Sequence, residues 1–416
     1  MTVLLHIIER HADELASLWD LRQRLATAHH FSFRELWVMD RRLEANVEGL
    51  ALAREEAWPI CRQQLGLETA GDVFTHAIVA FHAGRMDWLT EVLEAAKDSP
   101  RAWRGLVGAL GWIALPSVKP LLSFLLAASD PHQRRLGLAA AAAHRYDAGE
   151  PLRNALEDSA SSVRAEALRA AGELGLGMLD PVLRSHAHDP DPQCRFWAAW
   201  SASILARNSE ALQVLVDEIE AAGPLSEEAV GVVARRFSLD GAQRWLQRPD
   251  AAPPDLRVRL LAAGARGSPE LVSWLIAHMD APDTARLAGA SFAAITGVVL
   301  DRDGLEGERP ESVSAGPNED PADENVEMDA DGDLPWPSAQ KVRAFWNAYA
   351  ARFVSGERYL LGAPITAPGC MALLRSGRQE QRAAAAMELA LLQASPLFPV
   401  TAPAFRQSAL LASTSA

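Results

Sequence analysis

Apolar residues recur at helical spacing through the middle of the chain, in units of about thirty residues. In the clearest unit, Val163, Ala167, Ala170 and Leu174 follow one another at intervals of three or four, and a second amphipathic stretch follows a glycine-containing break. Residues at that interval share one face of a helix, so each unit predicts two short helices. Because a pair of that size cannot bury its apolar stripe alone, neighbouring pairs must stack. The pattern therefore predicts an all-α fold, an α-solenoid of helical pairs.

Arginines mark the period of these units. Most of them follow Asp, Ser or Pro residues of the kind that begin helices. The step from Arg195 to Arg257 is about twice as long as the others, which indicates one repeat without the arginine. The series consists of Arg104, Arg135, Arg164, Arg195, Arg257 and Arg286.

The repeats occupy residues 69–300, and the stretches on either side predict different units. Residues 1–68 have helical periodicity without the arginine register, so we expect an N-terminal helical cap. Residues 301–335 are rich in Gly, Pro and acidic residues and predict a flexible insertion. Helical periodicity returns in residues 336–416, which predict a C-terminal helical region with one more pair of the repeat type. The final SALLASTSA is expected to fray.

The negative charge of the chain is concentrated in the insertion. The net charge is −14, and the stretch from Asp301 to Asp333 contains 13 acidic residues and 2 arginines, a balance of −11. The rest of the chain is nearly neutral, and since nucleic-acid binding draws on an excess of Lys and Arg, we expect no nucleic-acid partner. A stretch of this composition buries little apolar surface, so we expect disorder from about Arg302 to Asp333.

The three cysteines, Cys61, Cys194 and Cys370, are too few for a disulfide framework in 416 residues. Such usage is typical of a reducing compartment, and Cys61 and Cys194, beside large apolar residues, are expected to be buried. The N-terminal residues lack the basic region of a signal peptide, and proline and lysine interrupt the apolar stretch at residues 106–128. We therefore expect a cytoplasmic protein without a membrane partner.

Two clusters of polar residues resemble metal sites, but neither has a full set of ligands. His186, His188 and Asp189 lie with Asp191 in a turn between repeats, where such residues usually cap helices or face solvent. The sequence EMDADGDLPWPS begins like a calcium loop, but Ser338 stands where a bidentate glutamate is required. The chain also lacks the phosphate-loop, HExxH and GxSxG motifs. We expect no catalytic residue, no metal and no cofactor.

Trp336 lies between two prolines at the end of the acidic insertion. It either anchors the return of the chain to the solenoid or forms an exposed contact, and we favour the anchor because large aromatic side chains are usually kept from water. As candidate partner-binding residues we select this tryptophan and four arginines of the repeat type. They are Trp336, Arg164, Arg195, Arg257 and Arg382.

The sequence DSASSVRAEALRAAGELG, residues 158–175, resembles the short HEAT-like repeat of bilin lyases and many bacterial scaffold proteins. The resemblance implies an α-solenoid of HEAT-like helical pairs with helical N- and C-terminal caps. Its matching positions are Asp158, Val163, Arg164, Ala167, Leu168 and Gly172.

The whole chain resembles a proteobacterial family of HEAT-like repeat proteins that is encoded in type VI secretion gene clusters, near spike, PAAR-like and adaptor genes. The resemblance is carried by FSFRELWVMDRRLEANVEGL, DGDLPWPSAQKVRAFW, RFVSGERYLLGAPI and RQEQRAAAAMELALLQASPLFPVTAPAFRQ. It implies an accessory adaptor or chaperone role in loading effectors, and it provides no catalytic residues to assign.

Our leading hypothesis is a non-enzymatic scaffold that binds a protein partner, a type VI secretion effector, PAAR-like or spike component. Two alternatives stay open. The first is a bilin-lyase-like HEAT enzyme, which would require a tetrapyrrole pocket. The second is an immunity protein that binds a co-encoded toxin.

Overall fold

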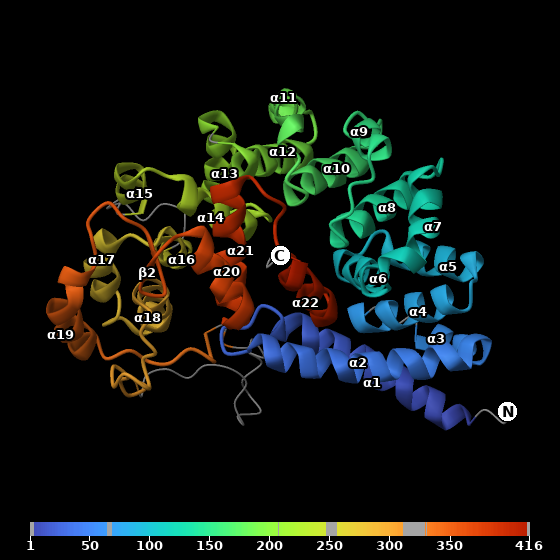
Figure 1. Cartoon of the computed structure of the whole chain (residues 1–416), viewed down its shortest axis with the longest axis horizontal. Coiled ribbons are helices and arrows are strands. Elements are labelled where there is room, and N and C mark those ends of the chain that lie inside the picture. Colours follow the sequence, from blue (N-terminus) through green and yellow to red (C-terminus); the bar gives the residue numbers. More distant parts are fainter. Residues whose placement is uncertain are drawn as a thin grey trace, which may run out of the picture. The chain divides into compact units, whose positions relative to one another are not determined.

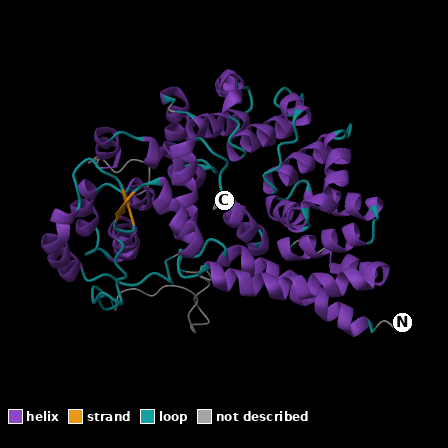
Figure 2. Cartoon of the chain, viewed as in Figure 1, coloured by secondary structure: helices purple, strands orange, loops and turns teal. Residues whose placement is uncertain are grey.

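The computed structural model describes residues 4–64, 69–206, 208–246, 256–310, 329 and 331–413, and these residues are predominantly helical. Within them, β1 (Tyr359–Leu360) and β2 (Ala363–Pro364) form one small antiparallel hairpin, and Figure 2 shows helices joined by loops elsewhere. The prediction of an all-α solenoid of helical repeats is confirmed. None of the described helices is both long and apolar enough to cross a membrane.

The chain folds as two compact units, which are described separately. Unit 1 consists of Met1–Ala206 and Cys370–Ala416, and unit 2 of Arg207–Gly369. The boundary between them therefore falls inside residues 69–300, the stretch that the repeat pattern treats as one solenoid, and the C-terminal residues belong to the same unit as the N-terminal ones.

Unit 1 begins with two long helices and continues with stacked pairs (Figure 1). The helices before the unit boundary are α1 (Leu5–Leu25), α2 (Phe33–Ala53), α3 (Trp58–Gln64), α4 (Ala70–His82), α5 (Met86–Ala96), α6 (Pro100–Trp112), α7 (Leu115–Leu126), α8 (Pro131–Ala143), α9 (Glu150–Ala155), α10 (Ser161–Glu173), α11 (Asp180–Ser185) and α12 (Pro192–Leu205). Helix α20 (Ala367–Ser376) crosses the boundary, and α21 (Gln379–Gln393) and α22 (Ala404–Ser413) complete the unit.

The repeats of unit 1 are pairs in which a shorter helix packs on the helix that follows it. The pairs are α5–α6, α7–α8, α9–α10 and α11–α12, and the second helices pack on one another in chain order, from α6 to α12. The local signals are those the sequence indicates, since Asp130 and Asp191 cap α8 and α12, and a proline follows each cap. The hydroxyl of Ser201 donates a hydrogen bond to the Leu168 carbonyl at 2.6 Å, and Ser201 lies against Gly172. A larger residue than glycine would separate α10 from α12 there.

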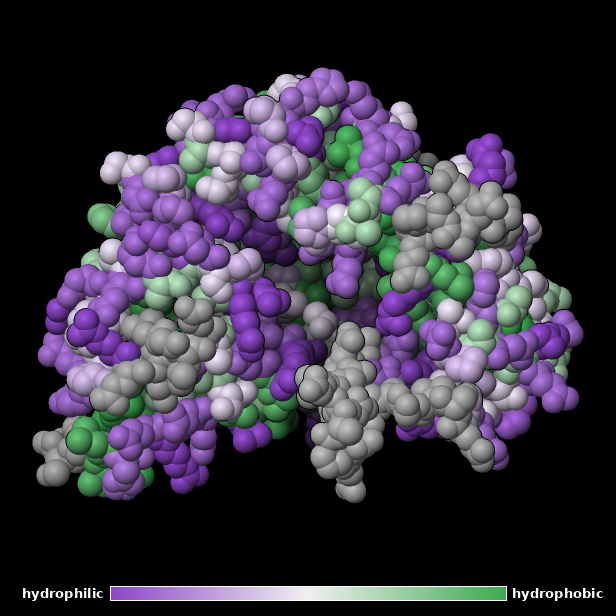
Figure 3. Space-filling model, turned by 180° about the vertical axis from the view of Figure 1, so that it is seen from behind, coloured by the Kyte–Doolittle hydropathy of each residue, from purple (hydrophilic) through white to green (hydrophobic). Residues whose placement is uncertain are grey.

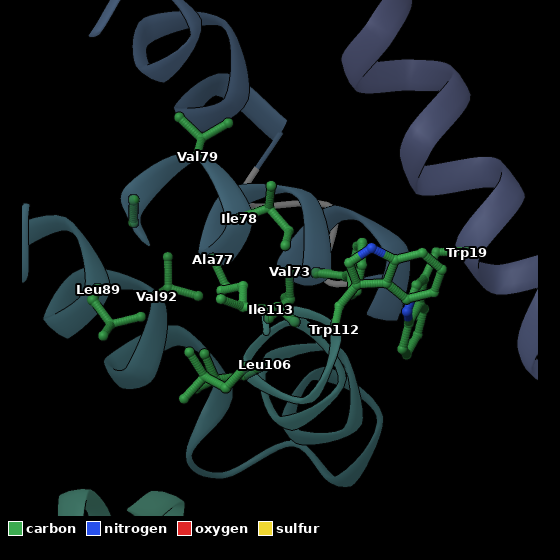
Figure 4. Close-up of a cluster of buried hydrophobic side chains, with 14 of the residues drawn as sticks. Trp19, Val73, Ala77, Ile78, Val79, Leu89, Val92, Leu106, Trp112 and Ile113 are labelled. Atoms are coloured by element: carbon green, nitrogen blue, oxygen red, sulfur yellow. The ribbon is translucent and has the colours of Figure 1, made fainter. Parts of the chain in front are cut away.

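A continuous apolar core runs through the first half of unit 1. Trp19 of α1 stacks on Phe74 of α4, with ring centroids 5.0 Å apart, and Trp112 of α6 meets Phe74 edge-on at 5.9 Å. Figure 4 shows Trp19 and Trp112 among the aliphatic side chains of α4, α5 and α6. Burial of so much apolar surface joins the N-terminal helices to the repeats as one body.

The C-terminal residues cross the ends of the repeat helices of unit 1. The Leu397 N–H donates to the Glu173 carbonyl at 2.9 Å, and Arg145 donates to the Leu397 carbonyl at 2.7 Å. Arg406 donates to the carbonyls of Ala143 and Gly111. The carbonyls of Gly111, Ala143 and Glu173 lie at the C-terminal ends of α6, α8 and α10, and at the first two the helix dipole favours the cation of Arg406. The predicted fraying of SALLASTSA is wrong for residues 408–413, because α22 extends to Ser413 with Leu411 buried; residues 414–416 lie outside the described residues.

Unit 2 has the same paired arrangement. Pairs α13–α14, α15–α16 and α17–α18 are stacked through α14, α16 and α18, and α19 and then the hairpin follow. The helices are α13 (Ser209–Glu220), α14 (Ser226–Arg236), α15 (Leu239–Leu246), α16 (Leu256–Arg266), α17 (Val272–Ala277), α18 (Pro282–Thr296) and α19 (Ala339–Tyr349). Ser291 donates to the Leu260 carbonyl at 2.8 Å beside Gly264, as Ser201 does in unit 1.

Short 3-10 helices complete both units. They are η1 (Arg54–Ala57), η3 (Gly177–Leu179) and η4 (His186–His188) in unit 1, and η5 (Pro269–Leu271) and η6 (Ala350–Arg352) in unit 2.

The two described ends of the acidic insertion are folded parts of unit 2. Leu305 is buried, and the backbone pairs with the start of α19: Gly307 N–H donates to the Trp336 carbonyl at 2.7 Å, and Ser338 N–H to the Leu305 carbonyl at 2.8 Å. The predicted disorder from Arg302 to Asp333 is therefore wrong at these ends, because they bury an apolar side chain and satisfy each other's backbone groups. Residues 311–328 and 330 lie outside the described residues.

Candidate functional site

Arg164 and Arg195 join the loops between repeats in unit 1. Arg164 donates to both carboxylate oxygens of Asp189, at 3.1 and 3.0 Å, and to the carbonyls of Asp158 and Ser159. Arg195 donates to the carbonyls of Asp189 and Pro190 at 2.7 and 3.1 Å. The two predicted arginines thus form consecutive steps of one ladder, and their hydrogen bonds are directed at the chain itself.

The ladder begins at Arg134, whereas the arginine series read from the sequence contains the next residue, Arg135. Arg134, and not Arg135, donates to the carbonyls five and six residues before it, as Arg164 and Arg195 do, and to the Asp158 carboxylate at 2.8 and 2.9 Å. Arg135 lies instead over the Trp103 ring, 4.1 Å from its centroid. Two adjacent arginines point to different sides of a helix, so the one-residue choice changes the contact.

Arg257 of unit 2 binds a carboxylate supplied by the acidic insertion. Its two terminal nitrogens donate to Asp331 at 2.6 and 2.5 Å. Arg286 donates to the Asp331 carbonyl at 2.8 Å and pairs with Asp329 at 2.7 Å. The two aspartates that resemble calcium ligands are therefore bound by arginines, and the described residues contain no cluster suited to a metal ion.

Trp336 lies half-buried under Arg286, whose guanidinium carbon is 4.7 Å from the ring centroid. Together with the backbone bond to Gly307, this contact anchors the end of the insertion, in agreement with the favoured interpretation.

Arg382 is a core residue of unit 1. It is completely buried, its donors bond Leu374, Gln379 and Gln407, and its guanidinium carbon lies 4.0 Å from the Phe33 centroid. Burial lowers the pKa of Arg382 to about 10. The prediction that Arg382 contacts a partner is wrong, because no surface of its side chain is accessible.

The histidine and aspartate cluster between α11 and α12 has a structural role. His186 Nδ1 lies 3.0 Å from Asp189, and Asp191 accepts hydrogen bonds from the N–H groups of Gln193 and Cys194 at the start of α12. Cys61 and Cys194 are buried as expected, Cys370 is buried as well, and burial raises the pKa of the Cys61 and Cys194 thiols to about 12. A thiol with so high a pKa is a poor nucleophile at neutral pH.

An aromatic pocket lies between α2 and α22, which pack side by side in unit 1. Its volume is about 250 Å³, and Trp37 and Phe405 are each 44% exposed at its walls. Large aromatic side chains exposed on either side of a hollow are typical of surfaces that bind other proteins. The lining residues are Trp37, Asp40, Arg41, Glu44 and Phe405.

Buried contacts hold the walls of the aromatic pocket in place. Asp40 accepts hydrogen bonds from Arg22 at 2.6 and 3.1 Å and from the N–H of Ala404, the first residue of α22, at 2.6 Å. Glu44 accepts from the indole N–H of Trp112 at 2.8 Å, and Phe405 lies edge-on to Trp112 with centroids 6.0 Å apart. The pocket therefore rests directly on the apolar core and is preorganised.

Sequence reasoning missed this pocket because its two walls are far apart in the chain. The hydrogen bond from Ala404 to Asp40 joins residues 364 positions apart. One signal was present: Trp37 falls among Arg34, Arg41 and other polar residues on the exposed side of an amphipathic helix, where a tryptophan is unusual.

The fold and the pocket define an α-solenoid of HEAT-like repeats with an exposed aromatic site. In agreement, residues 149–224 match the family model of HEAT repeats. The match includes the predicted repeat at residues 158–175, and repeats of this kind are commonly protein-interaction scaffolds. No curated protein and no solved structure matches the chain.

Proposed function

We propose that the chain is a non-enzymatic scaffold that binds another protein through the aromatic pocket of unit 1. The observation that carries the proposal is the pair of exposed aromatic walls, Trp37 and Phe405, on a rigid buried support. Exposed aromatic residues of this kind contribute most of the binding energy at protein interfaces. The volume of about 250 Å³ lies below the roughly 300–1,000 Å³ of small-molecule sites, which favours a protruding side chain as the occupant.

The C-terminal residues support this choice of surface. In unit 1 they cover the ends of α6, α8 and α10 and bond their carbonyls, so those groups are already occupied. The aromatic pocket forms beside this covered edge and is completed by Phe405 of α22.

As the particular role, we propose a cytoplasmic adaptor or chaperone for a type VI secretion effector, PAAR-like or spike component. Support comes from the resemblance described above, whose segments at residues 31–50 and 378–407 include both walls of the pocket. Reduced, buried cysteines agree with a cytoplasmic location.

Affinity purification of the tagged chain from cells that express its neighbouring genes tests the role. We expect a spike, PAAR-like or effector protein to be retained in an amount close to that of the tagged chain. Retention of none of them would contradict the adaptor role. Two further measurements separate the alternatives: protection of a susceptible cell from a co-encoded toxin would indicate an immunity protein, and an absorbance change on mixing with a bilin would indicate a lyase.

A further inference from the structure

We propose that the aromatic pocket takes one large apolar side chain from an acidic segment of the protein partner, with Arg34 and Arg41 binding carboxylates on either side of it. This inference rests on the proposed function and specifies the chemistry of the partner. It follows from the shape of the pocket, from the contacts already made by its carboxylates, and from the cations left on the exposed face of α2.

The space and its walls suit a single apolar side chain. Trp37 comes from α2 and Phe405 from α22, and about 250 Å³ lies between them and the polar residues at the base. A leucine, phenylalanine or tryptophan inserted there would cover apolar surface on both walls and recover the hydrophobic free energy of that surface. Asp40 holds the start of α22, and Trp112 packs against Phe405. Binding therefore requires little loss of side-chain freedom at this wall.

The carboxylates of the pocket are engaged by the protein itself. Asp40 is almost completely buried and accepts three hydrogen bonds, from Arg22 and from the Ala404 N–H. Glu44 accepts the indole N–H of Trp112. These contacts leave the two acidic side chains poorly placed to bind a cationic side chain of a partner.

Two arginines on the exposed face of α2 form no ion pair within the part of the chain that the structure describes, and one of them, Arg41, lines the pocket. Arg34 and Arg41 are exposed, lie one turn before and one turn after Trp37 on α2, and form no ion pair with any residue that the structure describes. The Arg41 guanidinium carbon is 5.6 Å from the Trp37 centroid, a contact that leaves its N–H groups available. Exposed guanidinium groups beside an aromatic ring suit carboxylates, which bind arginine in a bidentate manner.

Figure 3 shows, for contrast, a second exposed apolar surface, at the end of α1 near the N-terminus. Its exposed side chains are Leu4, Leu5 and Ile7. Nothing described around it selects one occupant, whereas the aromatic pocket combines defined walls with arginines that form no ion pair among the described residues.

Peptide binding to the full chain tests the inference by fluorescence anisotropy. The probes are three labelled peptides: Glu-Glu-Asp-Leu-Trp-Glu-Glu, the same peptide with lysines in place of the acidic residues, and the same peptide with serines in place of Leu and Trp. We expect saturable binding of the first peptide, and at least tenfold weaker binding of the other two.

Variants of the pocket identify the binding surface. Trp37→Ala and Arg41→Glu are each expected to weaken binding of the acidic peptide at least tenfold, because exposed Trp and Arg residues of this kind dominate interfaces. Arg42→Glu makes the same charge change at the next residue, which does not line the pocket and faces Glu14 of α1. Phe124→Ala removes an aromatic side chain that is 56% exposed on α7. Both controls are expected to bind as the unchanged chain does.

Two results would overturn the inference: failure of the acidic peptide to bind, or binding that Trp37→Ala and Arg41→Glu leave unchanged. Preference for the lysine peptide would also overturn it and would favour a basic partner. The proposed function is tested separately. If the partner retained from cells is held equally by the chain and by the Trp37→Ala, Arg41→Glu double variant, the scaffold role stands and the pocket assignment fails; if no partner is retained, the adaptor role fails whatever the peptide result.

Discussion

In both units an arginine near the start of a repeat helix binds a carboxylate, but that carboxylate comes from a different part of the chain in each unit. In unit 1, the carboxylate that binds Arg164 belongs to the next loop, 25 residues further on. In unit 2, the carboxylate that binds Arg257 lies 74 residues further on and belongs to the acidic insertion. Asp329 and Asp189 form a similar local turn, since the carboxylate of each accepts a hydrogen bond from the N–H of the second residue after it.

The comparison shows that the source of the carboxylate differs between the two units. Arg164 is the fourth residue of α10 and Arg257 the second residue of α16, and each helix is the second of its pair. In the loop before α18 the local aspartate, Asp280, lies 3.6 Å from Arg343. Arg257 binds Asp331 of the insertion, which makes the end of the insertion part of the fold of unit 2.

The largest expected effect is that of Asp189→Ala in unit 1. The Asp189 side chain is nearly buried and accepts from Arg164, His186 and Asp191, so its removal leaves a largely buried guanidinium without its carboxylate. We expect a loss of about 3 kcal/mol in the free energy of unfolding, measured by urea denaturation. Asp180→Ala, which breaks the more exposed pair with Arg184, is the control and should cost less than about 1 kcal/mol. Equal losses in the two variants would contradict the ladder in unit 1.

Acidification is expected to have the next largest effect. Partial burial by itself raises the pKa of Asp189, but hydrogen bonds from Arg164, the Asp191 N–H and His186 outweigh it and lower that pKa to about 2, from an ordinary value of 3.8. A carboxylate with a lowered pKa in the folded state contributes its full stability well above the ordinary pKa and loses it as the pH falls through the folded-state value. Urea midpoints measured from about pH 5 down to about pH 2.5 should therefore fall more steeply for the unchanged chain than for Asp189→Asn. If the urea midpoints of the two chains fall with pH at the same rate, Asp189 does not contribute to the acid sensitivity.

A smaller effect is expected for Asp331→Ala in unit 2. The Arg257 side chain is 40% exposed, so solvent screens the pair more than it screens Arg164 and Asp189. We expect a loss of about 1 to 2 kcal/mol, with faster hydrogen exchange in α16 and α18 and no change in α10 and α12. Asp301→Ala removes an exposed aspartate of the same insertion and serves as the control. If Asp331→Ala shows the same hydrogen-exchange pattern as Asp301→Ala, the pair between Arg257 and Asp331 does not stabilise unit 2.

The smallest expected effect is the difference in stability between variants of two adjacent residues, Arg134 and Arg135. Arg134→Ala removes the contacts to Asp158, Ala128 and Ser129, whereas Arg135→Ala removes the contact with Trp103 and a 4.0 Å ion pair with Glu166. We expect Arg134→Ala to be the more destabilising by about 1 kcal/mol in thermal or urea unfolding. The reverse order would place Arg135 in the ladder, as the arginine series first indicated.

The helical pairs could be predicted from the sequence because their signals are local. Capping residues such as Asp130 and Asp191, the prolines that follow them and the apolar spacing of residues 163–174 all act within a few positions of each other. The selection of repeat arginines as candidate partner-binding residues was less successful. Arg164, Arg195 and Arg257 bind the chain itself, and Arg382 is buried, because a repeated residue in such an array is as readily used for stacking as for binding.

The sequence by itself determined the class of fold, the period of the repeats and the location of the negative charge, since each depends on neighbouring residues. Only the tertiary structure decided which carboxylate meets Arg257, and that Phe405 of the last helix stands beside Trp37 of the second. Both pairings join residues far apart in the chain. The free energy that selects them comes from packing between elements, which no local pattern of hydrophobic and polar residues records.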